Sequence, residues 1–171
     1  MTELDTMRDP CFIRICHGGT LGDDNHRALM AFASDVCRDL LEHLDRTDRR
    51  DLLTDALKTA EAWVRGTDKA GDCIAASRAL HRIARETDDP LEHHVIRAFA
   101  HGVATAHMAD HAMGPVIYGM KAIRETGKDP ATWKDDALNL LKGLDEGLHA
   151  CFVRGLRSKG IGSDKTTGQK N

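Results

Sequence analysis

The sequence predicts an all-α fold, a single compact bundle of about six helices. Three observations predict it. Apolar residues recur at intervals of three and four along most of the chain, as on the buried face of a helix. Residues that favour strands are scarce, since aromatic residues make up only 4% of the sequence. Hydrophobic residues make up 41%, which is enough for one core, and the length of 171 residues fits one domain.

The N-terminal half is predicted to hold an arm and three helices. Residues 1–22 are expected to form an extended arm on the bundle, because 11–16 is a short β-prone run ended by Gly18 and Gly19. Asp23 and Asp24 can cap a helix near 25–44. Further helices are expected near 49–65 and 69–86, where apolar residues again recur at helical spacing.

The C-terminal half is predicted to hold three more helices and a tail. Asp89-Pro90 opens a helix from 91 to about 112, which we expect to be central because its inward face is small. A short helix covers 116–126, and Asp129-Pro130 starts a long one to about 155. The bundle domain is thus expected over 23–156. Residues 157–171, rich in Gly, Ser, Thr and Lys, are expected to be a disordered tail.

The sequence predicts a cytoplasmic protein. No apolar stretch approaches the roughly 20 residues that span a bilayer, and no signal-peptide pattern is visible. The five cysteines are an odd, scattered set and are therefore expected to be reduced. Three of them are expected in the core: Cys37, Cys73 and Cys151.

Histidines are numerous, and five of them lie in 93–111. His107 and His111 are four residues apart, a spacing at which two imidazoles on a helix can hold one metal ion, completed by His81 or His149. On a continuous helix His101 points away from both, so we favour structural histidines and expect no metal and no cofactor.

Catalytic patterns find little support. No serine lies in a Gly-x-Ser-x-Gly elbow. Glu146 and His149 form the only Glu-x-x-His motif, where a di-iron bundle needs two. The sequence therefore predicts a binding protein and not an enzyme.

Charge suggests the kind of partner. The net charge of −3 argues against a nucleic-acid partner, which would need a basic face. Acidic residues crowd the turns between helices, where most of them suit helix capping. In addition, we expect some to form an acidic ridge that binds a basic partner. The candidates are Asp48, Asp51, Asp55, Asp88, Asp89 and Glu92.

Three passages resemble the Imm-5-like immunity proteins of bacterial polymorphic toxin systems, some of which carry an exonuclease SbcC label. The first is DPCFIRI at 9–15 with GGTL at 18–21 and DNHR at 24–27. The second is the helix end at 56–66, which closes on WVRG. The third runs from Ala98 through His107 and His111 to Ala122. The resemblance implies a helical, non-catalytic protein that binds and blocks a cognate toxin.

Two alternatives stay open. One is a metal-dependent helical-bundle enzyme that uses His107 and His111. The other is a structural or regulatory homo-oligomer, formed through small residues of the fourth helix together with one or more of four methionines. Those methionines are Met7, Met108, Met113 and Met120.

Overall fold

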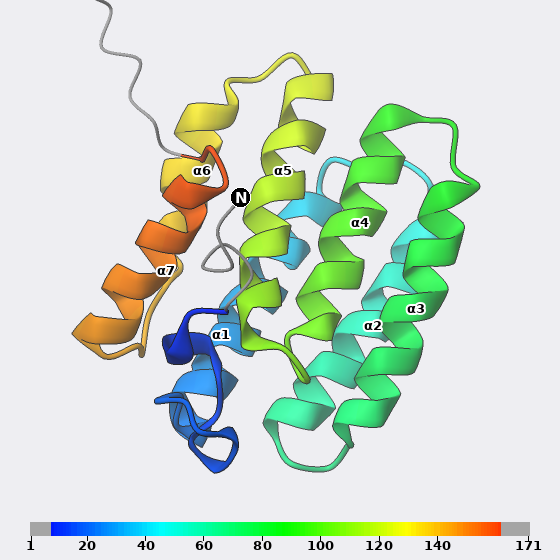
Figure 1. Cartoon of the computed structure of the whole chain (residues 1–171). Helices are drawn as coiled ribbons and strands as arrows, with labels where there is room; N and C mark the ends of the chain where they lie inside the picture. The colour runs from blue at the N-terminus through cyan, green and yellow to red at the C-terminus, as the bar shows by residue number, and fades with distance from the viewer. Residues whose placement is uncertain (1–7, 162–171) are drawn as a thin grey trace, which may run out of the picture.

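The computed structural model describes residues 8–161, which form seven α-helices. Figure 1 shows them packed side by side. Their bounds are α1 (Asp23–Leu41), α2 (Thr47–Val64), α3 (Ala70–Arg85), α4 (Pro90–Ala104), α5 (Gly114–Glu125), α6 (Pro130–Leu138) and α7 (Glu146–Ser158). Three short 3-10 helices accompany them: Pro10–Phe12, Ile15–His17 and Ala109–Met113. The predicted all-α bundle is confirmed, with seven helices in place of about six. None of these helices is long and apolar enough to cross a bilayer.

Helix α4 is the centre of the bundle, as its small residues predicted. It contacts α1, α2, α3 and α5. A Cβ atom on Gly102 would lie 2.8 Å from the Cys37 sulfur on α1, so the absence of a side chain allows this close approach. The small residues assigned to self-association are thereby used inside the molecule. Met113 is buried as well, and Met7 lies outside the described residues.

The buried residues form two clusters. The larger lies among α1, α2, α3, α4 and α5. The smaller packs the N-terminal segment and α7 against α1, α5 and α6, with the rings of Phe32 and Phe152 edge to face at 5.3 Å. Helix α1 contributes to both clusters and so joins them.

The two Asp-Pro starts are confirmed by their geometry. Asp89 Oδ1 accepts a 2.7 Å hydrogen bond from the Glu92 amide, and Asp129 accepts one of 2.9 Å from the Thr132 amide. The predicted cap of α1 is wrong. Gly22 is its N-cap, so Asp23 and Asp24 lie inside the first turn, where their charge suits the helix dipole.

Two predicted helices are broken in the structure. The one expected over 91–112 ends at Ala104. The Thr105 carbonyl accepts a 2.6 Å hydrogen bond from His26 Nε2, in place of the backbone amide that would continue the helix. The one expected over 130–155 ends at Leu138. The chain then passes Gly143 at a φ of +76°, a conformation that favours glycine, and Asp145 caps a new helix through the Leu148 amide.

The N-terminal segment lies on the bundle as predicted, but it is not extended. Residues 8–22 form two 3-10 turns and an isolated bridge between Arg14 and Leu21. Phe12 and Leu21 are buried in the smaller cluster. The predicted tail begins too early, since α7 continues to Ser158; its part from residue 162 onward lies outside the described residues.

The prediction that all cysteines are reduced is wrong for one pair. A disulfide joins Cys11 to Cys151 on α7. Cys37, Cys73 and Cys151 are buried as expected. Disulfides persist in oxidising compartments, so the cytoplasmic location stays a prediction that the redox state of this pair in cells would test.

Candidate partner-binding site

The first candidate surface is formed where α2 and α4 begin. Arg46 Nη1 lies 3.3 Å from Glu92 Oε2, and Arg49 Nε bonds the other oxygen of the same carboxylate. These contacts hold the N-terminal ends of the two helices together. Glu92 therefore ties α2 to α4, a role that spacing along the sequence did not reveal.

The structure brings most of the predicted acidic residues to this end. Asp48 lies beside Arg46 Nη2 at 2.9 Å, and hydrogen bonding to that guanidinium lowers the pKa of the Asp48 carboxyl. Asp51 and Asp88 are exposed, and Asp89 caps α4. Asp55 lies further along α2 and is exposed, with Lys58 at 2.8 Å. Glu92 is the exception: its side chain is only 6% exposed, so it is withdrawn from the surface that a partner could touch.

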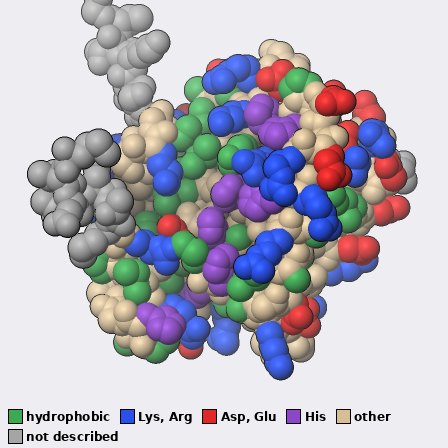
Figure 2. Space-filling model, turned by 45° about the vertical axis from the view of Figure 1, so that its right-hand side comes forward, with side chains coloured by type: hydrophobic (Ala, Val, Ile, Leu, Met, Phe, Trp, Pro, Cys, Tyr) green, Lys and Arg blue, Asp and Glu red, His purple; other side chains and the backbone are tan. Residues whose placement is uncertain are grey.

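The second candidate surface is a row of histidines on α3, α4 and the 105–113 segment that follows α4. Figure 2 shows histidine side chains gathered in a band on this face, with Lys and Arg side chains beside them. We call it the histidine band: His81, His93, His94, His101, His107 and His111.

The expectation that His101 points away from His111 is wrong. Their Nδ1 atoms lie 3.1 Å apart, as in a hydrogen bond between two neutral rings. The expectation assumed one continuous helix. Because α4 ends at Ala104, the chain turns and returns His111 to the side of His101. The His107 ring lies 5.5 Å from that of His111, and the His81 ring 5.0 Å from that of His101.

Neighbouring residues fix the rings of the band. Tyr118 on α5 stacks on His101, with ring centroids 5.2 Å apart. Arg97 Nη1 donates a 2.8 Å hydrogen bond to His81 Nδ1, which must therefore be unprotonated. His93 Nδ1 donates to the Ala84 carbonyl at 2.7 Å. The band is thus an ordered set of side chains from α3, α4 and the 105–113 segment, with Tyr118 of α5 packed against it.

Burial and neighbouring cations favour the neutral form of four imidazoles of the band. Burial, with the charges of His111, His81 and Arg97, lowers the pKa of His101 to about 3. Burial also lowers the pKa values of His81, His94 and His111. At neutral pH these imidazoles therefore act as hydrogen-bond donors and acceptors without charge.

The histidine band does not assemble a three-ligand metal site among residues 8–161. In that range, the one group whose three ligand atoms lie within 4.8 Å of one another is Asp9, Cys11 and Cys151, of which the two sulfurs are already bonded to each other. His149 is exposed on α7, away from the band. The geometry gives the proposed pair His107 and His111 no third ligand in this part of the chain.

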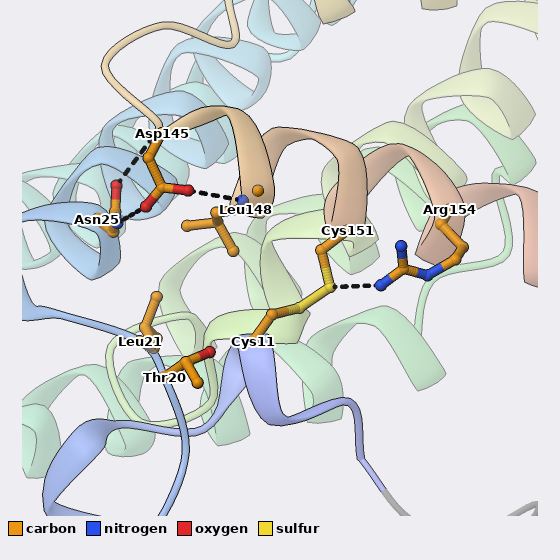
Figure 3. A pocket seen from close by; sticks show the side chains of 9 residues that line it. Cys11, Thr20, Leu21, Asn25, Asp145, Leu148, Cys151 and Arg154 are labelled. Carbon is orange, nitrogen blue, oxygen red and sulfur yellow. Dashed lines mark hydrogen bonds between the residues drawn. A yellow bond between two sulfur atoms is a disulfide. The ribbon is translucent and has the colours of Figure 1, made fainter.

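A hollow of about 300 Å³ lies between the N-terminal segment and α7 (Figure 3). Its polar groups already bind one another. Asn25 donates to Asp145, Asp145 caps α7, and Arg154 donates to the Cys151 sulfur at 3.3 Å. Hydrogen bonds from the Leu148 amide and Asn25 lower the pKa of Asp145. These side chains hold α7 in place, so we assign the hollow a structural role.

Comparison with known proteins decides the family. Residues 19–143 match the family described as Imm-5 like putative immunity protein. The chain belongs to this family. No curated protein and no solved structure matches the chain.

The match to the Imm-5-like family covers α1 to α6, and with them both candidate surfaces. Two of the three resembling passages, at 56–66 and 98–122, lie wholly inside it. Of the first passage, DPCFIRI at 9–15 precedes the match, whereas DNHR at 24–27 lies inside it. Helix α7 and the Cys11–Cys151 disulfide also lie outside the matched residues.

Sequence reasoning missed several residues that build these surfaces. Arg46 and Arg49 were not seen as partners of Glu92, nor Arg97 and Tyr118 as neighbours of the histidines. A signal exists only for Arg97, which lies four residues before His101 and so on the same face of α4. The other contacts cross between helices, and their pairing needs the fold.

Proposed function

We propose that this chain neutralises a cognate bacterial toxin by binding it and covering its active site, without catalysing a reaction itself. Membership of the Imm-5-like family carries the proposal. It would act in the cytoplasm of the cell that makes the toxin.

The acidic end of the bundle supplies a surface suited to a basic toxin. Asp48, Asp51, Asp88 and Asp89 gather there around the Arg46–Glu92 contact. Asp51 and Asp88 are exposed, and no ion pair involving either is seen among the described residues. Such charges raise the association rate with an oppositely charged partner more than they raise affinity.

The test is protection of cells. The toxin encoded beside the gene is expressed with and without this chain, and survival is counted. We expect survival with the chain and a complex of the two purified proteins in solution. If the chain is expressed and folded but protects against none of the neighbouring toxins, the proposal is contradicted.

Charge reversal tests the surface. Asp51→Lys with Asp88→Lys is expected to slow association about tenfold or more at low salt. The matched control reverses two exposed acids on α6, Asp135 and Asp136, and should leave the rate unchanged. Asp89 is left intact because it caps α4. Equal effects of the two double variants would show that net charge matters and this surface does not.

A further inference from the structure

Cations without acidic partners border the histidine band. Arg85, Arg97, Lys121 and Arg124 lie on α3, α4 and α5, and none of them forms an ion pair within residues 8–161. On the other side of the bundle, Arg38 is paired with both Asp35 and Glu61. In a chain of net charge −3, this face thus holds four cations that the fold does not pair with acids.

Tyr118 holds the centre of this face in place. His101 stacks on its ring, Lys121 Nζ lies 4.8 Å from the ring centroid, and Arg97 Cζ lies 5.5 Å from it. Cation–π contacts of this kind fix where the two charges sit. The Nε of Arg97 is buried and has no hydrogen-bond partner, so the guanidinium is not satisfied by the protein alone.

Few acids oppose these charges. Glu125 faces His94, and Asp110 faces His111. Asp110 is already paired with Arg8 at 3.3 Å, and Arg8 and Lys159 add further positive charge around His111. The balance on this face is therefore positive, in contrast to the acidic end formed by α2 and α4.

We infer that the histidine band, with Arg97, Tyr118 and Lys121, binds a short carboxylate-rich segment of a partner protein. Carboxylate oxygens accept hydrogen bonds from guanidinium, ammonium and imidazole N–H groups, which are the donors that this face presents. The surface adjoins the acidic end at the start of α4 but differs from it in charge, so the inference stands apart from the proposed function.

The geometry favours a protein segment over a nucleic acid. Single-stranded nucleic acids bind through aromatic rings that stack on bases, and His101 and two cations already occupy the surroundings of Tyr118. Asp88 and Asp89 precede the band on the chain, beside His93, and Asp110 lies at its other end. These acids would repel an extended phosphate backbone, whereas a short acidic segment fits between them.

The test uses a peptide rich in Asp and Glu as the probe. The side-chain resonances of the histidines are followed by NMR while the peptide is added at low salt. We expect shifts at His94, His101 and His111, and none at His17 and His149, which are exposed on other elements. Arg97→Gln with Lys121→Gln should weaken binding about five- to tenfold.

Controls separate the possible results. Arg65→Gln with Lys142→Gln removes two exposed cations from other parts of the surface and should leave binding unchanged. If the Arg97 variant fails to fold, exposed Lys121→Gln alone provides the same test with a smaller loss. The inference is overturned if the peptide does not bind, if shifts spread equally to His17 and His149, or if both double variants weaken binding alike. Tighter binding at the band by a single-stranded oligonucleotide of equal charge would also overturn it.

Discussion

Single glycines decide how closely neighbouring helices approach in this bundle. A Cβ atom on Gly119 of α5 would lie 2.1 Å from the Trp133 ring on α6, and one on Gly114 would lie 2.2 Å from the His101 Cβ atom. Trp133 cannot simply move aside, because its Nε1 donates a 2.7 Å hydrogen bond to Asp39 on α1. The ring is therefore held against the bare backbone of α5.

Gly119→Ala is expected to lower the free energy of unfolding by about 1–3 kcal/mol, since the added methyl group overpacks this contact. Urea unfolding followed by circular dichroism measures the change. Gly71→Ala on α3 is the matched control: no atom lies within 4 Å of its added Cβ atom, and we expect unchanged or slightly higher stability. Equal stability of the Gly119 variant and the wild type would refute the overpacking argument.

Residue roles within the site were predictable from the sequence only where they depend on local geometry. Asp89 capping α4 follows from an Asp-Pro pair at a helix start. The burial of Glu92 could not be predicted in this way, because its carboxylate pairs with two arginines 43 and 46 positions away. The contact of His101 with His111 was missed because it requires the chain to leave the helix after Ala104.

At the scale of elements, the link between α2 and α4 depends on one carboxylate. Glu92→Gln removes the charge that Arg46 and Arg49 share, while it keeps the size of the side chain. We expect a loss of about 1–3 kcal/mol of stability, because the replacement weakens two charge-assisted hydrogen bonds to a buried group. Asp55→Asn, which affects only the exposed pair with Lys58, should cost less than about 0.5 kcal/mol. Chemical denaturation of both variants measures whether Glu92→Gln loses more stability than Asp55→Asn.

Helix α7 is attached to the N-terminal segment by the Cys11–Cys151 disulfide. Reduction of the Cys11–Cys151 disulfide, or Cys11→Ser, is expected to cost about 2–5 kcal/mol, since the bond closes a loop with a sequence separation of 140 residues. Cys16→Ser is the control, because Cys16 is a free, exposed thiol. Thermal unfolding with and without reductant measures the effect. If reductant leaves the melting temperature unchanged, the bond is absent or contributes nothing.

Helix periodicity predicted most elements, within a few residues at each end. It failed at 105–113 and at 139–145. There the apolar spacing continues, but the backbone is diverted by His26 binding the Thr105 carbonyl and by Gly143. The Cys11–Cys151 pairing could not be predicted from the sequence either, because five cysteines allow many pairings and only the fold brings these two together.

For the whole molecule, buried neutral histidines make stability depend on pH. The folded state lowers the pKa values of His26, His81, His94, His101 and His111 below the ordinary value of 6.5. Below that value the unfolded chain binds more protons than the folded protein, so the free energy of unfolding falls as pH falls.

Acidification from pH 7 to pH 5 is therefore expected to lower stability. His101, with its pKa of about 3, should contribute on the order of 1 kcal/mol after solvent screening of its part-buried ring. Denaturation at a series of pH values measures the slope, which should be shallower in His101→Gln. His149→Gln, at an exposed histidine on α7, should leave the slope as it is. If His101→Gln leaves the dependence of stability on pH unchanged, His101 does not contribute to it.

The covalent bond between Cys11 and Cys151 also turns most of the backbone into a ring. A protease that cuts once at an exposed turn inside this ring, such as Gly66-Thr67, cannot release a fragment. The nicked protein should run as one species on a non-reducing gel and separate into two pieces once a reductant is added. A single cleavage would thus leave both halves tethered and able to stay assembled.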